Sequence, residues 1–150
     1  MLAGQVIAAY GRHYLVETAE GRQYACFPRG KKSTVACGDR VMFARTGDEQ
    51  GVIEAVDPRS TLFSRSAAHR QKLIAANVSR LAIVVAAEPS FSEELINRCL
   101  VAAEYQSMHA LILLNKCDLK DAAMAAMARL EPYAQAGYRV VRLSALEGAE

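Results

Sequence analysis

Several patterns that mark whole classes of protein are missing from this 150-residue sequence. It has no unbroken apolar run of about 18 residues, which a membrane-crossing helix requires, so we expect no membrane partner. Its first residues show no basic segment followed by an apolar stretch and a cleavage site, which predicts a cytoplasmic protein. The four cysteines form no Cys-x-x-Cys pair and have no histidine at ligand spacing, which favours reduced thiols over disulfides or a zinc site. We therefore expect no metal site in these residues.

A phosphate-binding loop is missing as well. The motif Gly-x-x-x-x-Gly-Lys-Ser/Thr cradles nucleotide phosphates with its backbone N–H groups. The nearest segment has Ala25 in place of the first glycine and Lys32 in place of the hydroxyl residue. No Asp-x-x-Gly segment stands at the end of an expected strand to hold magnesium. We assign no catalytic residue, and we expect no nucleotide hydrolysis by this chain alone.

Positive charge is concentrated in the first half of the chain. The formal net charge is only +2, but residues 1–70 carry 10 Lys and Arg against 7 Asp and Glu, and residues 71–150 carry 8 against 9. A local excess of this kind suits a polyanion, because each phosphate contact releases bound counterions. The alternative is an ordinary solvated surface. The candidate RNA-binding residues are Arg29, Lys31, Lys32, Arg65, Arg70 and Lys72.

Residues 1–63 are predicted to form a small β-barrel. Short alternating strands are separated by turn signals about every ten residues, a pattern typical of a five-stranded OB-fold. Such barrels often bind nucleic acid on one face. The aromatic residues of this part are either base-stacking residues or, more commonly, core; they are Tyr10, Tyr14, Tyr24 and Phe27. Residues 64–79 are polar and basic without a strong period, and we interpret them as a linker or a short exposed segment.

Residues 80–150 show a different pattern, in which apolar strands alternate with amphipathic helices. Three strands are expected, at 81–87, 110–114 and 138–143. Ser90 and Glu93 match a capping box at the start of the first helix, and Asp121 is a candidate cap for the second. Strand–helix–strand repeats require right-handed crossovers and a parallel sheet. The fold class is therefore β + α/β, an OB-fold barrel followed by a partial, Rossmann-like parallel domain.

Polar residues follow the second and third of these strands, at the edge where parallel sheets bind ligands. The candidate guanine-binding residues are Asn115, Lys116, Cys117, Asp118, Ser144 and Ala145. An ionised Asp118 can accept hydrogen bonds from guanine N1–H and from its amino group together, whereas adenine offers no such pair of donors. The alternative is a helix-capping Asp118 and an Asn115 turn.

The other residues of the motif have supporting roles in this interpretation. Asn115 would bond the opposite edge of the base and tie the two loops together. The stem of Lys116 would lie over the ring, and the N–H of Ala145 would reach the base carbonyl.

Six segments together resemble one family, the circularly permuted, ribosome-small-subunit-dependent GTPases, or RsgA/YjeQ family. The segments are residues 4–6, 37–41, 53–59, 77–80, 115–119 and 143–145. In that family an OB-fold comes first, then a P-loop GTPase domain whose guanine motifs precede the phosphate loop, then a zinc-binding domain. The resemblance implies GTP or GDP as ligand, the small ribosomal subunit and its rRNA as partners, and a role in late maturation of that subunit.

The sequence departs from the family pattern by representing its N-terminal portion only. The resemblance places the phosphate loop, the magnesium site and the structural zinc after Glu150, so we expect this chain to bind GTP and GDP weakly or not at all. The alternative function is an RNA-binding OB-fold module with an incomplete, non-catalytic α/β appendage. We also expect self-association, or a loosely ordered second half, because the strand at 139–143 would present an unpaired edge.

Overall fold

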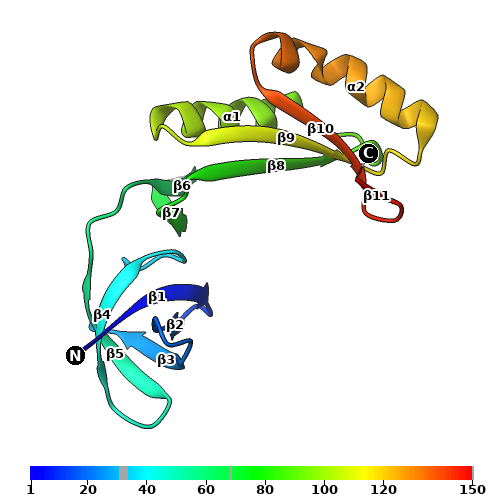
Figure 1. The fold of residues 1–150 in the computed structure, drawn as a ribbon. Coiled ribbons are helices and arrows are strands. Elements are labelled where there is room, and N and C mark those ends of the chain that lie inside the picture. The colour runs from blue at the N-terminus through cyan, green and yellow to red at the C-terminus, as the bar shows by residue number, and fades with distance from the viewer. Residues whose placement is uncertain (31–33, 68, 150) are drawn as a thin grey trace. The chain divides into compact units, whose positions relative to one another are not determined.

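The computed structural model describes residues 1–30, 34–67 and 69–149, which form two compact units, Met1–Val78 and Ser79–Glu150 (Figure 1). Lys31 and Lys32, two of the candidate RNA-binding residues, lie outside the described residues. Neither helix within the described ranges has the length and hydrophobicity that crossing a membrane requires.

Five strands of the first unit close into a barrel in the order β1-β2-β3-β5-β4. They are β1 (Leu2–Ala9), β2 (Tyr14–Glu17), β3 (Gln23–Pro28), β4 (Arg40–Arg45) and β5 (Gln50–Val56). Successive side chains of a strand face opposite sides, so alternate residues point inward, and Val6, Val16 and Phe43 are among the buried ones. The prediction of an OB-like barrel is confirmed.

The aromatic residues of the barrel divide between core and surface. Tyr14 and Tyr24 are 5% and 3% exposed and belong to the core, the more common of the two interpretations. Tyr10 and Phe27 are 59% and 45% exposed. Burial therefore excludes base stacking by Tyr14 and Tyr24, whereas the exposed rings of Tyr10 and Phe27 are accessible to a base.

Most of residues 64–79, interpreted from the sequence as a linker or a short exposed segment, belong to two strands. β6 (Leu62–Ala67) and β7 (Arg70–Ala76) pair antiparallel as a two-stranded sheet, with a register shift between Phe63 and Ser64. Much of this hairpin is in contact with solvent, so it lacks the strictly alternating apolar face that signals a strand in a sequence. The hairpin belongs to the first unit together with the barrel.

A buried ion pair joins the start of β4 to the segment that follows β5. Asp39 is fully buried, and its carboxylate accepts two hydrogen bonds of 2.7 Å from the Arg59 guanidinium and one of 2.7 Å from the Ala36 N–H. The hydrogen bond to Asp39 raises the pKa of Arg59. Two of the segments that resemble the family, 37–41 and 53–59, meet in this contact.

Asn77 fastens the end of the hairpin to the barrel. Its side-chain NH2 group donates to the Gly38 carbonyl at 3.0 Å, and its oxygen accepts the Ser60 N–H at 2.9 Å. Gly38 has a φ of 94°, and a Cβ at this position would collide with the Ala76 carbonyl oxygen, so the close approach requires glycine. The hairpin is thus held directly against the backbone of the barrel.

The second unit is a four-stranded sheet in the order β11-β10-β9-β8 with two helices. Its elements are β8 (Arg80–Ala86), α1 (Glu93–Tyr105), β9 (His109–Asn115), α2 (Lys120–Gln135), β10 (Arg139–Ser144) and β11 (Gly148–Ala149). β8, β9 and β10 are parallel, which confirms the predicted parallel α/β pattern. β11 runs antiparallel to the last two residues of β10, so the edge expected to be unpaired is covered at that end. β8 forms the opposite edge of the sheet.

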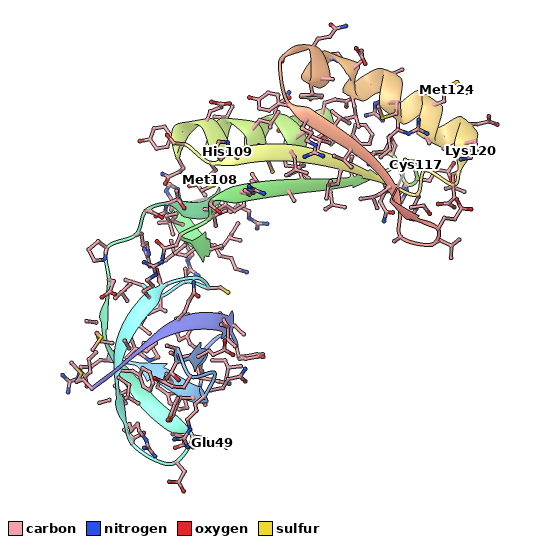
Figure 2. All side chains as sticks on the ribbon, viewed as in Figure 1. Glu49, Met108, His109, Cys117, Lys120 and Met124 are labelled. Atoms are coloured by element: carbon pink, nitrogen blue, oxygen red, sulfur yellow. The ribbon has the colours of Figure 1, made fainter. Side chains whose placement is uncertain are left out.

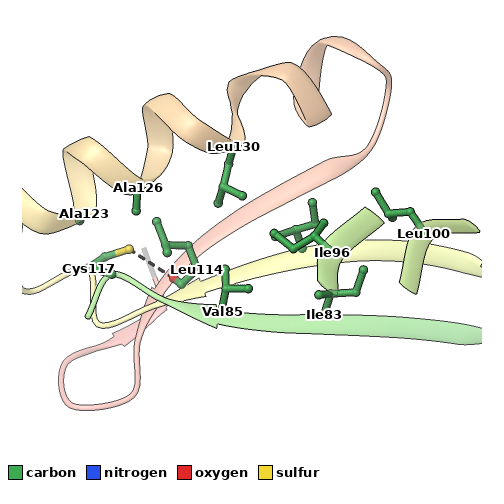
Figure 3. Close-up of a cluster of buried hydrophobic side chains, with 11 residues drawn as sticks. Ile83, Val85, Ile96, Leu100, Leu114, Cys117, Ala123, Ala126 and Leu130 are labelled. Carbon is green, nitrogen blue, oxygen red and sulfur yellow. Dashed lines mark hydrogen bonds between the residues drawn. The ribbon is translucent and has the colours of Figure 1, made fainter. Parts of the chain in front are cut away.

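Both helices pack on the same face of the sheet (Figures 1 and 3). The buried cluster beneath them includes Ile83 and Val85 of β8, Ile96 of α1 and Leu130 of α2. Val84, between the two buried residues of β8, faces the other way and is 63% exposed. One face of the sheet therefore forms the core of the unit, and the opposite face carries apolar surface in contact with solvent.

The helix starts differ from the predicted caps. α1 begins at Glu93 without a side-chain cap bond, and the N-cap of α2 is Leu119 rather than Asp121. Ser90 and Glu93 instead each accept a hydrogen bond of 2.6 Å from Arg129 of α2. The bond from Arg129 lowers the pKa of Glu93. The two residues that resemble a capping box thus connect the start of α1 to α2 through Arg129.

Candidate guanine-binding site

The candidate guanine-binding residues lie in the loops that follow β9 and β10. These strands are parallel neighbours, with Leu114 opposite Arg142, so their carboxyl ends lie side by side. The Cys117 N–H donates to the Leu143 carbonyl at 3.1 Å, which holds the first loop against the end of β10. Figure 2 shows Cys117 and Lys120 where β9 leads into α2.

Asn115 joins the two loops. Its side-chain oxygen accepts the N–H of Lys116 at 2.8 Å and the N–H of Ala145 at 2.9 Å. The first bond is local, but the second crosses from one loop to the other. The Ala145 N–H, which the sequence assigns to the base carbonyl, therefore donates to Asn115 in this structure.

Asp118 is held by the residue that ends β10. Its Oδ1 accepts the Ser144 hydroxyl at 2.7 Å, and Ser144 is only 3% exposed. The Ser144 hydroxyl oxygen also accepts the Glu147 N–H at 3.2 Å, which helps to fix its direction. A carboxylate has about four acceptor positions, so the bond from Ser144 leaves Asp118 further acceptor capacity.

The alternative role of Asp118 as a helix cap does not match the start of α2. The N-cap residue is Leu119, whose carbonyl accepts the Ala123 N–H at 2.8 Å and which makes no side-chain cap bond. A capping carboxylate would accept from N–H groups of the first helical turn. The Asp118 carboxylate is instead directed toward Ser144, in the loop after β10.

The two central residues of the motif have opposite surroundings. Lys116 is exposed and has a φ of 63°, an uncommon backbone conformation for a residue with a side chain. Cys117 is fully buried in the core, and its thiol donates to the Leu114 carbonyl at 3.3 Å (Figure 3). The Cys117 side chain therefore packs beneath the site, where a base does not reach it, although the sequence places this residue in the motif.

Sequence reasoning missed two backbone contacts that shape the site. The Ala87 N–H, just after β8, donates to the Asn115 carbonyl at 3.0 Å. The Glu147 N–H donates to the Ser144 hydroxyl. Because nearly every residue carries a backbone N–H, no side-chain pattern signals either contact in the sequence.

Four of the candidate RNA-binding residues lie within the described ranges, and they fall into two groups. Arg65, Arg70 and Lys72 share one exposed face of the hairpin, because Arg65 pairs with Lys72 and Arg70 lies two residues before Lys72. Arg29 lies after β3 and pairs with Glu54 at 2.8 Å, while its side chain stays 74% exposed. Like charges directly opposite each other destabilise a strand pair, so the hairpin face suits an anionic partner.

The cysteines give no further site. All four are free thiols, and burial raises the pKa of Cys26 to about 11. Within the part of the chain that the structure describes, no three His, Cys, Asp or Glu side chains are placed to hold a metal ion.

The match to a known protein family covers more than half of the chain. A family model described as RsgA GTPase matches residues 56–150. The chain belongs to the RsgA GTPase family. It is 53% identical over 144 residues to the small ribosomal subunit biogenesis GTPase RsgA of Nitrosospira multiformis, covering 96% of this chain and 46% of that relative. The RsgA of Burkholderia pseudomallei is 50% identical over 142 residues, covering 94% of this chain and 45% of that relative.

Two solved structures have a fold similar to that of this chain. YjeQ from Thermotoga maritima is similar with a TM-score of 0.71 and 28% identity, over 99% of this chain and 53% of that one. YloQ, described as a circularly permuted GTPase, is similar with a TM-score of 0.65 and 27% identity, over 97% of this chain and 52% of that one. The chain thus spans about half the length of the relatives it matches.

Proposed function

We propose that this chain is the N-terminal part of a GTPase that acts in late maturation of the small ribosomal subunit, and that the loops after β9 and β10 recognise guanine. The observation that carries the proposal is the position of Asp118, which Ser144 holds at the carboxyl ends of two parallel strands. Open α/β sheets bind ligands at this edge. The relatives' names support the ribosomal role.

Asp118 supplies the selectivity for guanine in this proposal. Its remaining acceptor positions match the N1–H and amino donors of guanine, and a charged acceptor strengthens both bonds. Adenine presents an acceptor at N1, so binding it would leave the carboxylate facing a lone pair. Ser144 acts as a positioning residue, because its hydroxyl orients the carboxylate.

Asn115 serves the opposite edge of the base. Its oxygen accepts two backbone N–H groups, so its NH2 group is the donor that suits the acceptor N7 of guanine. The base carbonyl would share the Ala145 N–H with Asn115 or take it over. The exposed Lys116 would cover the ring with its aliphatic stem.

The phosphates, the magnesium ion and the catalytic groups are assigned to the half of the relatives that this chain does not match, as is the structural zinc. Most nucleotide affinity in this class of protein comes from backbone N–H groups and a lysine around the phosphates. We therefore propose that the full protein, in the cytoplasm, binds and hydrolyses GTP, and that the present chain contributes base recognition.

The basic face of the β6–β7 hairpin is proposed to contact rRNA. Arg65, Arg70 and Lys72 present three positive charges on one side of a two-stranded sheet. Asn77 and Gly38 hold that sheet against the barrel, so the charges sit on a fixed support. Phosphate contacts by such a face give affinity without sequence preference.

A second candidate function is an RNA-binding module whose α/β unit has no catalytic role. The observation that favours it is the basic hairpin face combined with a sequence that has no phosphate loop. In this case the bond between Asp118 and Ser144 would serve only to stabilise the loops.

Titration of the isotope-labelled chain with GMP and AMP, followed by NMR, separates the two functions. Guanine recognition predicts that the amide signals of Lys116, Ala145 and Glu147 move with GMP at millimolar concentrations and stay in place with AMP. Shifts of equal size with both nucleotides, or none with either, would contradict guanine recognition. The RNA-binding module would then be the remaining candidate function.

A further inference from the structure

An open groove of about 860 Å³ lies between α1 and the last turns of α2. Leu100 lines this α1–α2 groove and is 5% exposed, because it also belongs to the buried cluster beneath the helices (Figure 3). Tyr133 and Tyr138 line it from the end of α2 and the turn that follows. None of the candidate guanine-binding residues lines the groove, so it is a separate feature of the second unit.

α1 carries apolar side chains on a second face besides the one that packs on the sheet. Its buried residues are Ile96, Leu100 and Ala103. Val101 and Tyr105 are four residues apart and therefore lie on one side of the helix. Both line the α1–α2 groove, although they are 69% and 86% exposed. A surface helix ordinarily has one apolar stripe toward the core and polar residues elsewhere, so the second stripe marks an interaction site.

Two tyrosine hydroxyls connect the sides of the groove. The Tyr133 hydroxyl donates to Asn97 Oδ1 at 2.7 Å, and the Tyr138 hydroxyl donates to Glu104 Oε1 at 3.0 Å. The bond to Glu104 raises the pKa of Tyr138, so this phenol stays protonated as the donor. A carboxylate has about four acceptor positions, so Glu104 keeps further acceptor capacity. The groove is thus already formed in the unbound chain.

The charge around the groove is negative. Among the described residues that line it, Glu104 is the one charged residue, and no Lys, Arg or His within the described ranges forms an ion pair with it. α1 holds three acidic residues and one arginine, while α2 holds two residues of each sign. This balance repels phosphates and attracts Lys and Arg. Two copies joined groove to groove would place like charges together, so the groove suits a cationic segment of another protein.

We propose that the α1–α2 groove binds a basic, amphipathic helix of a partner protein, whose apolar side chains contact Val101 and Tyr105 and whose Lys or Arg pairs with Glu104. Apolar grooves receive such helices through side chains at positions i, i+3 or i+4, and i+7. α1 has 13 residues and is therefore about 20 Å long, which a partner helix of about four turns would match. The groove offers no strand edge, so an added strand is not the mode of binding. This surface adds a protein partner to the proposed function and does not depend on base recognition.

The test titrates the chain with a labelled helical peptide of about 15 residues that carries a leucine at every third or fourth position and lysines beside them. Val101→Ser and Tyr105→Ser each remove apolar lining, and each should weaken binding about fivefold or more. Leu95→Ser is the matched control, because Leu95 is 60% exposed on the same helix and does not line the groove. It should keep the wild-type affinity. Circular dichroism checks that all three variants fold, as expected from exposed positions.

The charge of Glu104 is tested separately. Glu104→Gln keeps an oxygen that accepts the Tyr138 hydroxyl and removes the negative charge. This variant should bind the lysine peptide about two- to fivefold less tightly, the size expected for an exposed ion pair. A second peptide with glutamates in place of the lysines should bind the wild type more weakly than the lysine peptide does, and it should lose less affinity for Glu104→Gln.

Several results would overturn this inference. They are absence of binding by the lysine peptide, equal binding of the two peptides by the wild type, and wild-type affinity in both Val101→Ser and Tyr105→Ser. Light scattering addresses the remaining occupant, a second copy of the chain. A wild-type dimer that Tyr105→Ser converts to a monomer, while Leu95→Ser leaves it intact, would assign the groove to that copy and overturn the basic partner helix.

Discussion

The Arg59 guanidinium donates two hydrogen bonds of 2.7 Å to the fully buried carboxylate of Asp39. The two residues come from segments 37–41 and 53–59, which are two of the segments that resemble the family. Their contact gives both segments one structural role, because it anchors the chain leaving the barrel at β5 to the start of β4. The hairpin that carries the basic face follows directly after this anchor.

Arg59→Ala is expected to lower the free energy of unfolding of the first unit by about 3 kcal/mol, since it leaves a buried carboxylate without its cation. Denaturant unfolding monitored by circular dichroism measures this change. Asp48→Ala is the matched control, because its pair with Arg45 spans 3.8 Å with the Asp48 side chain fully exposed. The control should change stability by less than about 0.5 kcal/mol. An equally small change for Arg59→Ala would contradict the anchoring role.

RNA binding through the hairpin face is expected to depend steeply on salt. Arg65→Gln and Lys72→Gln should each reduce the slope of log affinity against log salt concentration by about 0.7–0.9 per lost phosphate contact. Lys31→Ala and Lys32→Ala are expected to act in the same way. Arg98→Gln is the control, since this exposed arginine lies on α1 in the other unit. Unchanged slopes in the basic-face variants would assign these residues to ordinary solvated surface.

Self-association is expected through the β8 side of the sheet rather than through the strand at 139–143. Within the described ranges β8 has β9 as its one strand neighbour, and Val84 on the face away from the helices is 63% exposed. Open strand edges with apolar surface pair with other chains. Val84→Lys should shift light scattering toward the monomer, whereas Met124→Lys on the outside of α2 should not. A monomeric wild-type chain at high concentration would count against this expectation.

The sequence predicts those parts of the fold that repeat a local pattern. Alternating short strands and apolar strand–helix repeats identify the barrel and the parallel sheet, because burial of one face imposes the period. The sequence does not predict the β6–β7 hairpin, because this hairpin is largely exposed and lacks that alternating pattern. The order of the strands is not predicted either, because periodicity does not show that β8 lies at one edge of the sheet or that β11 pairs with the end of β10.

The sequence predicts where the candidate site residues lie along the chain, but it does not predict the contacts they make. The spacing of Asn115 and Asp118 places both at a strand end, as found. It does not show that the intervening Cys117 turns into the core, nor that the Ala145 N–H donates to Asn115. The predicted helix cap at Ser90 is wrong because the side chain accepts a hydrogen bond from Arg129, which is 39 residues away in the sequence. A local sequence pattern does not show such a distant partner.

Nucleotide binding by this chain alone is expected to be weak. The groups proposed to hold the base are present, but a phosphate loop is absent from the sequence, and phosphate contacts supply most of the affinity. Calorimetry should detect no micromolar binding of GTP or GDP, and no phosphate should be released from GTP. Micromolar affinity for the isolated chain would show that phosphate-binding groups exist elsewhere in it.

The central claim is that the Asp118 carboxylate selects guanine. In the full-length protein, Asp118→Asn would replace one acceptor by an NH2 donor, which would face the guanine amino group. Loss of a hydrogen bond to a charged group costs about 1.5–3 kcal/mol, so GDP affinity should fall at least about tenfold. Xanthine carries a carbonyl at that position and keeps its N1–H, so xanthosine diphosphate should gain affinity.

Competition binding of GDP and xanthosine diphosphate to wild type and Asp118→Asn is the most direct measurement, with Asp121→Asn in the first turn of α2 as the control. We predict that the preference switches to xanthosine diphosphate in Asp118→Asn and stays with GDP in Asp121→Asn. Unchanged GDP affinity and preference in Asp118→Asn would contradict guanine recognition by this site.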